Sequence, residues 1–265
     1  MTEGKSALSK LKDTAKRYPV LVETYWVVFN LKRYIEIHRE WIKFKSETKI
    51  PRFTLSWKDR KFYCKDASPF TDFDSQYIYH TAWAARCLAK TKPDSHTDIS
   101  SFLYFSTIVS AFIPVKFYDY RPAKVCLSNL ISEHADITTL PFEKGSIKSL
   151  SCLHTVEHIG LGRYGDKIDP DGDLKAIAEL KRVLALGGNL LFAVPVGKDA
   201  RIIFNGHRIY TFDQVITYFK GLKLVEYSLI TDNPNLDIFI ENADPKLTDV
   251  CSNGCGCFWF MKDRG

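Results

Sequence analysis

Short runs of apolar, β-prone residues alternate with stretches of helical periodicity through most of the chain. The run from Ser146 to His154 predicts a strand that is buried on both faces. Residues 173–184 predict a helix, and the apolar run 189–196 predicts a second strand directly after it. Strand, loop, helix and strand in this order are typical of one βαβ unit of a parallel sheet.

The helix of this unit has a regular apolar stripe. Leu174, Ile177, Leu180 and Leu184 recur at helical spacing, among residues with high helix propensity. Gly187-Gly188 follows this stripe, and we expect it to end the helix in the left-handed conformation that glycine adopts readily.

The same pattern extends on both sides of the central unit. Polar and glycine-containing segments separate the remaining runs, and residues 211–214 (Thr-Phe-Asp-Gln) form a capping-box sequence at a helix start. The pattern predicts helices at 74–90, 102–112 and 211–219, and strands at 95–101 (with the turn that leaves it), 115–119, 133–137, 222–230 and 255–261. The last two strands have no predicted helix between them, which favours an antiparallel pair at the end of the sheet.

The N-terminal part differs in composition. Residues 1–60 hold 14 Lys and Arg against 7 Asp and Glu, so their balance of +7 accounts for the whole net charge of +6. We expect two domains: a basic, aromatic-rich helical extension with a connector over residues 1–70, and an α/β domain over residues 71–265. Residues 4–48 predict two helices that are separated near Tyr18-Pro19.

The second of these helices allows two interpretations. Its aromatic residues lie among lysines and arginines, and such a helix can bind an anionic membrane surface. Alternatively, residues 18–48 form an ordinary amphipathic helix that packs on the domain or on a partner protein. No nucleic-acid-binding module is recognisable, so we expect no nucleic-acid partner.

Seven cysteines at irregular spacing are typical of reduced thiols, which favours a cytoplasmic protein. Neither a signal peptide nor a membrane-spanning run is apparent in the sequence. Cys251, Cys255 and Cys257 lack a second ligand pair of the usual zinc spacing. His154-x-x-Glu157-His158 matches the spacing of the inverted zinc-protease motif, but that motif requires a helix, and a strand is predicted here. We therefore expect no metal site.

The loop after the strand 146–154 is rich in groups that can do chemistry. It contains His154, Glu157, His158, Arg163 and Tyr164, together with several glycines and aspartates. A connector that only closed a βαβ crossover could be much shorter. Ligands of such sheets bind outside the carboxyl ends of the strands, so we expect this loop to form a functional site.

Acidic residues end three consecutive predicted strands. They are Asp98, Asp119 and Asp136, and Asp119 lies 21 positions after Asp98. This is close to the spacing at which doubly wound folds place an acid against a ribose. Each aspartate alone is more often a turn or cap residue. Together they predict an edge that binds ribose hydroxyls and an adenine amino group.

Residues 135–142 (Ala-Asp-Ile-Thr-Thr-Leu-Pro-Phe), the strand through His154 and residues 179–188 resemble class I S-adenosylmethionine-dependent methyltransferases. The resemblance covers residues 75–262. More narrowly, residues 152–166 and 204–208 resemble a methyltransferase-like family of unknown function that is found in nematodes and bacteria.

The resemblance implies a Rossmann-like, doubly wound sheet of seven strands in the order 3-2-1-4-5-7-6, with the last strand antiparallel. It implies S-adenosylmethionine as cofactor. The residues that it implies for cofactor binding are Asp98, Ser100, Ser101, Asp119, Asp136 and Ile137. One departure is clear, since the family has glycines after the first strand and this chain has Asp98-Ile-Ser-Ser101. We expect a turn without glycine at this point to be costly.

Two function classes follow. The first is a methyltransferase of a small, anionic or sugar-like acceptor, and histidine is the base best matched to neutral pH. The second is a non-catalytic binding or scaffold protein that has lost the glycine loop. For the enzyme, the expected catalytic residues are His154, Glu157, His158 and His207, and the expected substrate-binding residues are Arg163, Tyr164 and Arg208.

Overall fold

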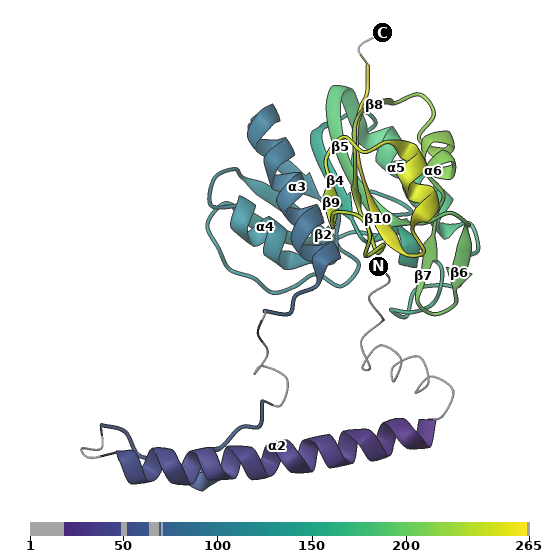
Figure 1. Ribbon diagram of the computed structural model, residues 1–265. Coiled ribbons are helices and arrows are strands. Elements are labelled where there is room, and N and C mark those ends of the chain that lie inside the picture. Colours follow the sequence, from purple (N-terminus) through teal and green to yellow (C-terminus); the bar gives the residue numbers. More distant parts are fainter. Residues whose placement is uncertain (1–18, 49–51, 64–68, 70, 264–265) are drawn as a thin grey trace. The chain divides into compact units, whose positions relative to one another are not determined.

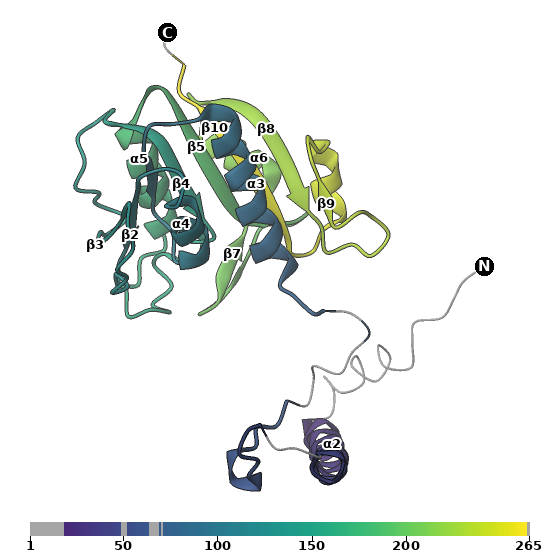
Figure 2. The ribbon, with the colours of Figure 1, turned by 90° about the vertical axis from the view of Figure 1, so that its left-hand side faces the viewer.

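The computed structural model describes residues 19–48, 52–63, 69 and 71–263, and the side chains of 19–29 are left out of the description. The chain divides into two compact units, one ending at Asp72 and the other beginning at Phe73. Figures 1 and 2 show the elements of each unit. No helix among the described residues combines the length and the apolar character that crossing a membrane requires.

The described residues of the first unit form the long helix α2 (Pro19–Glu47) and a 3₁₀ turn, η1 (Trp57–Asp59). The helix predicted before Tyr18 lies outside the described residues. Trp57 packs edge-on against Trp41 and His38, with ring centroids 5.4 and 4.8 Å apart. Part of the aromatic side of α2 therefore packs within its own unit. Binding of residues 18–48 to a membrane surface or to a partner protein stays a prediction.

The second unit is a Rossmann-like α/β domain (Figure 1). Its helices and 3₁₀ turns are α3 (Ser75–Thr91), α4 (Leu103–Val109), η2 (Val156–His158), α5 (Gly172–Val183), α6 (Phe212–Tyr218) and η3 (Pro245–Val250). Its strands are β1 (His96–Asp98), β2 (Val115–Asp119), β3 (Leu130–His134), β4 (Ile147–Leu153), β5 (Leu184–Val196), β6 (Arg201–Ile203), β7 (His207–Ile209), β8 (Lys223–Ile230), β9 (Phe239–Ile240) and β10 (Gly254–Met261).

The order of the main sheet is β3-β2-β1-β4-β5-β10-β8-β9. The predicted order 3-2-1-4-5-7-6 is confirmed for its first seven strands, and β10 is antiparallel to both β5 and β8. The sheet has eight strands rather than seven, because the two-residue strand β9 pairs with the outer edge of β8. A separate hairpin of β6 and β7 forms within the segment 197–210, where no strand was predicted.

Helices cover both faces of the sheet, as a doubly wound fold requires (Figure 2). One core holds α3 and α4 against the sheet through residues such as Trp83 and Phe105, and the other holds α5 and α6 through residues such as Leu180 and Phe219. The capping box of Thr211 and Gln214 is confirmed at the start of α6.

The glycine pair after α5 has a different role from the predicted one. The helix ends at Val183, and the next residue, Leu184, is already extended and begins β5. Gly187, with a φ of 72°, lies inside this strand at an irregularity in its pairing with β4. A Cβ at Gly188 would come within 2.8 Å of the carbonyl oxygen of Ala185. The glycines therefore allow a bulge in the strand, and they do not end the helix.

Two further predictions differ from the structure: the bounds of the third strand and the buried face of α5. The third strand is Leu130–His134 and ends before Asp136, because it pairs with β2 from Leu130 onward. On α5, Leu174 is 40% exposed, while Ile177 and Leu180 are buried. The buried face of α5 consists of Asp173, Ala176, Ile177, Leu180 and Val183, so Leu174 lies outside it, and Leu184 is buried as part of β5.

Candidate functional site

A cavity of about 400 Å³ opens at the carboxyl ends of β1, β2, β3 and β4. This size lies in the range of ligand pockets for small molecules. Of the residues predicted for a site, Ser100, Ser101, Asp119, Asp136, Ile137, His158 and Tyr164 line it. Asp98, His154, Glu157, Arg163, His207 and Arg208 do not.

Two acids lie along the β2 and β3 side of this cavity. Asp119 ends β2, and its Oδ1 accepts a hydrogen bond from the backbone N–H of Arg121 at 2.6 Å. Asp136 follows β3, and its Oδ1 accepts from the backbone N–H of Thr138 at 2.8 Å. Both aspartates thus form Asx turns that orient them. Within the described part of the chain, Oδ2 of each accepts no hydrogen bond, so these oxygens are available to a ligand.

The serine-rich turn after β1 is not strained. No residue from Ile99 to Phe102 has a positive φ, so the turn needs no glycine, contrary to the expectation that serine would make it costly. The Ser100 hydroxyl donates to Asp98 at 2.6 Å and accepts from the backbone N–H of Leu153 at 2.9 Å. Ser100 therefore joins β1 to β4, and Ser101 is the exposed serine at the cavity.

Asp98 is fully buried behind the cavity, where the hydroxyls of Ser100, Ser106 and Ser151 donate to its carboxylate. Burial raises its pKa, and the three hydroxyl donors oppose that rise. Ser151 also lies 2.8 Å from Nε2 of the buried His96. Direct cofactor binding by Asp98 was predicted from its strand-end position, but the geometry makes it part of an internal polar network.

His158 is the histidine of the central loop that lines the cavity. Its Nδ1 lies 2.7 Å from the carbonyl oxygen of Gly206, in the turn between β6 and β7. A carbonyl only accepts, so Nδ1 carries the proton and, in the neutral ring, Nε2 keeps its lone pair, 3.8 Å from Oε1 of Glu157. The Arg163 guanidinium is 3.3 Å from Nδ1 and therefore donates to the same carbonyl, 3.2 Å away, rather than to the ring.

Cationic side chains gather beside Tyr164 at the cavity. Arg121 lies over the Tyr164 ring at 4.7 Å from its centroid, and Arg163 lies over it at 5.0 Å. Arg121 and Lys167 are exposed residues of the cavity lining. Arg121 and Lys167 were not predicted from the sequence, since only the paths of the β2 and β4 loops bring them to the same rim.

Arg208 was predicted to bind substrate, but it is 5% exposed and its donors are already used. It donates to the carbonyl oxygens of Ile159 at 2.6 Å and Pro170 at 3.1 Å, and its Nε lies 3.5 Å from the Asp173 carboxylate. Arg208 therefore ties the long loop after β4 to the hairpin and to α5. His207 also lies outside the cavity lining, with its ring centroid 6.3 Å from that of His158.

His154 and Glu157 are buried and do not line the cavity. His154 has a left-handed backbone with a φ of 51°. Its Nδ1 lies 2.8 Å from Oε1 of Glu157, and its Nε2 lies 3.1 Å from Sγ of Cys255. Burial alone would lower the pKa of His154. The adjoining Cys255 and Glu157 raise this pKa by more than burial lowers it, so the pKa of His154 lies well above its usual value. The buried positions of His154 and Glu157 do not favour the catalytic contact with substrate that was predicted for them.

The four glycines of the loop close it on itself. Gly160 has a φ of 80°, and its carbonyl accepts from the backbone N–H of Asp169 at 3.0 Å. A Cβ at Gly160 would overlap the Asp169 carbonyl, and one at Gly172 would come within 3.2 Å of Gly160. The loop therefore begins and ends at one point beside the cavity, with Gly160 and Gly172 in its lining.

Residues 142–246 match the family described as "Caenorhabditis protein of unknown function, DUF268". This segment includes the long loop and the β6–β7 hairpin, and it agrees with the resemblance to a nematode family. No protein with a curated description matches the chain in sequence.

Three solved structures illustrate the relatives of the fold. The N-methyltransferase NodS from Bradyrhizobium japonicum WM9, in complex with S-adenosyl-L-homocysteine, is 15% identical over 75% of this chain and 92% of its own, with a TM-score of 0.47. Geranyl diphosphate methyltransferase in complex with SAM is 11% identical over 70% and 86%, with a TM-score of 0.48. The [4+2]-cyclase SpnF is 13% identical over 70% and 81%, with a TM-score of 0.49. At such low identity the likeness concerns the fold alone.

Proposed function

We propose that this protein is an S-adenosylmethionine-dependent methyltransferase that acts on a small anionic acceptor. The observation that carries the proposal is the pair Asp119 and Asp136 beside one cavity of about 400 Å³, each with an oxygen free for a ligand. The cavity lies at the carboxyl ends of the central strands, where ligands of doubly wound sheets bind.

The residues of the cavity fit the cofactor part by part. Asp119 offers Oδ2 to the ribose hydroxyls, and Asp136 offers Oδ2 to the adenine amino group. Ile137 and Tyr118 supply apolar surface beside the base. Ser101 donates its hydroxyl to the carboxylate of the amino-acid tail, a position at which related enzymes use glycine. Bound there, the cofactor supplies an electrophilic methyl group.

The acceptor is anionic because cations border the same cavity. Arg121 and Arg163 both lie over the Tyr164 ring, and Lys167 belongs to the cavity lining. Guanidinium groups bind carboxylate or phosphate by paired hydrogen bonds. Alignment of acceptor and cofactor supplies most of the acceleration in methyl transfer.

His158 serves as the general base for an acceptor that must lose a proton. Its Nδ1–H bond to Gly206 holds the ring in the tautomer whose Nε2 accepts a proton. His154, Glu157 and His207 support this part of the loop rather than contact the acceptor. We propose a cytoplasmic location, which the irregular spacing of the seven cysteines in the sequence favours.

Binding of the cofactor tests the proposal most directly. S-adenosylmethionine and S-adenosylhomocysteine at about 100 times Kd should each stabilise the protein by about 2.7 kcal/mol, seen as a rise in Tm. Adenosine and methionine, each lacking half of the contacts, serve as weaker-binding controls. A Tm that neither cofactor form moves, together with no heat of binding in calorimetry, would favour the non-catalytic scaffold that keeps the fold without the cofactor.

A further inference from the structure

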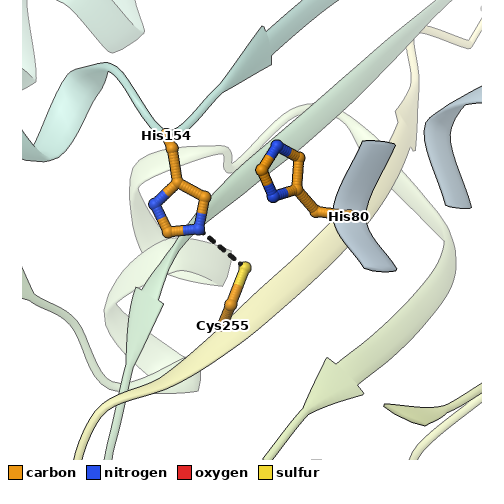
Figure 3. Close-up of side chains that lie close together, drawn as sticks. All are labelled: His80, His154 and Cys255. Carbon is orange, nitrogen blue, oxygen red and sulfur yellow. Dashed lines mark hydrogen bonds between the residues drawn. The ribbon is translucent and has the colours of Figure 1, made fainter. Parts of the chain in front are cut away.

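We propose that His80, His154 and Cys255 form a transition-metal site of the zinc class, separate from the cavity. Figure 3 shows their side chains converging from α3, from the loop after β4 and from β10. Their ligand atoms all lie within 4.8 Å of one another, and theirs is the one such group of three found in the parts of the chain that the structure describes.

Hydrogen bonds assign the tautomer of His80. Nδ1 of His80 lies 2.6 Å from the carbonyl oxygen of Gln76 and must donate to it. Nε2 of His80 is therefore unprotonated in the neutral ring, and it is buried without a hydrogen-bond partner. A buried polar atom without a partner requires an explanation, and a bound ion supplies one.

His154 is oriented in the way that metal-binding histidines usually are. Its Nδ1 faces the carboxylate of Glu157 at 2.8 Å, which leaves Nε2 directed at Cys255 (Figure 3). A carboxylate bonded to the far nitrogen of a ligating histidine fixes its ring and raises its basicity. Glu157 is fully buried and is thus a positioning residue for the site.

The donor set and its spacing suit zinc. Two imidazoles and one thiolate are ligands that Zn²⁺ accepts in tetrahedral sites, where three protein ligands leave a fourth position for water or another ligand atom. Ligand atoms around such an ion are about 3.3–3.8 Å apart, from the usual Zn–N and Zn–S lengths. Nε2 of His154 and Sγ of Cys255 are 3.1 Å apart and the three ligand atoms together lie within 4.8 Å, so binding an ion requires side-chain shifts of about 1 Å or less.

The surroundings of the site are dry and rigid. His80 and Cys255 are 0% exposed, and the Tyr77 ring stacks on His154 with centroids 5.4 Å apart. Coordination would join three segments that are far apart in sequence and would hold His154 in its left-handed backbone conformation. Metal binding displaces the thiol proton, so that a buried thiolate is neutralised by the ion.

The test uses the full-length protein, freed of metal by a chelator and titrated with Co²⁺ and then Zn²⁺. We expect about one metal ion per chain, a rise in Tm, and a thiolate-to-cobalt charge-transfer band that Zn²⁺ abolishes. Cys255→Ala should lose the band, whereas Cys152→Ala, which removes another fully buried cysteine, should keep it. His80→Phe retains an aromatic ring and should lower metal affinity by about 100-fold or more.

A wild-type protein that binds no stoichiometric metal and shows no cobalt–thiolate band would overturn the site, and this holds even if the variants fail to fold. An equal band in the Cys255→Ala and Cys152→Ala variants would also overturn it. Metal content and the cobalt spectrum are independent of S-adenosylmethionine, so failure of the metal site and failure of the methyltransferase proposal are distinguished.

Discussion

Nδ1 of His158 and the carbonyl oxygen of Gly206 are 2.7 Å apart and join the loop after β4 to the β6–β7 turn. Both segments leave the carboxyl ends of adjacent strands, β4 and β5, which explains why residues 48 positions apart meet at one rim. The bond also assigns the proton to Nδ1, so the position of Gly206 determines the chemistry that His158 can perform.

His158→Asn separates the joining of the two loops through Nδ1 from the acceptance of a proton by Nε2. The asparagine Nδ2 can replace Nδ1 as donor to Gly206, but nothing replaces Nε2. We expect Tm to change little and kcat to fall by roughly 10²–10⁴-fold for an oxygen acceptor, the usual contribution of a general base. Measured turnover close to that of the wild-type protein would show that His158 only joins the two loops.

Asp119→Asn should weaken cofactor binding. Asparagine keeps the oxygen that accepts from Arg121 and replaces Oδ2 by an amide donor, so the Asx turn survives. The expected loss is on the order of 1.5–3 kcal/mol, the range for hydrogen bonds to charged groups, and calorimetry with S-adenosylhomocysteine measures it. Asp237→Asn makes the same change at an exposed position outside the cavity lining and should leave Kd unchanged. Equal affinities for both variants would contradict the ribose assignment.

Substitution of Arg208 by methionine should have a different effect from the same substitution of Arg163. Arg208→Met leaves the buried Asp173 carboxylate without its guanidinium partner and removes donors to two carbonyls, so unfolding should become easier by about 3–5 kcal/mol. Arg163 is exposed, and Arg163→Met should shift stability by no more than about 0.5 kcal/mol while raising KM for an anionic acceptor. Denaturant unfolding and steady-state kinetics provide the two measurements. The reverse pattern would restore Arg208 as a substrate contact.

The buried His96 predicts a specific dependence of stability on pH. Burial lowers the pKa of His96 from 6.5 to about 3. Between these values the unfolded chain binds a proton that the folded chain does not, so this contribution to stability is complete above pH 6.5 and is lost as the pH falls toward 3. The slope approaches 1.4 kcal/mol per pH unit. Burial raises the pKa of Asp98, so Asp98 changes the stability with pH in the opposite direction. Its contribution cancels when the wild-type protein is compared with a variant of His96, because both contain Asp98.

His96→Gln isolates that contribution. The variant should be less stable than the wild-type protein at pH 7, because it cannot bond both Ser149 and Ser151 as the ring does. The difference in unfolding free energy should shrink as the pH falls from 6.5 to 4, and urea unfolding at several pH values measures it. A difference that stays constant over this range would mean that His96 is not held neutral in the folded protein.

Local chemistry explains the predictions that were right. Alternating apolar runs and helical periodicity predicted the helices and strands and the closing antiparallel pair, and the resemblance to methyltransferases implied the order of the first seven strands. Asp119, Asp136, His158 and Tyr164 reach the cavity because each follows the carboxyl end of a strand. The capping box at Thr211 depends only on residues three positions apart and was correct for the same reason.

Contacts between distant segments explain why two predicted site residues lie outside the cavity lining. Asp98 also follows the strand-end rule, yet three serine hydroxyls, one of them from β4, hold its carboxylate inside. Arg208 has the composition of a substrate ligand, but the loop after β4 folds back and offers it two carbonyl oxygens. Burial and hydrogen-bond partners are properties of the whole fold, and composition does not reveal them.

The sequence by itself determined the sheet, its strand-end acids and the loop that carries the histidines, because periodicity and turn chemistry act over a few residues. Only the tertiary structure decided which of these side chains share a cavity. It also brought Cys255 to His154 across 101 positions and added His80 from α3. Sequence spacing argued against a metal site there, since the three residues are adjacent only after β10 has paired with β5 and α3 has packed on the sheet.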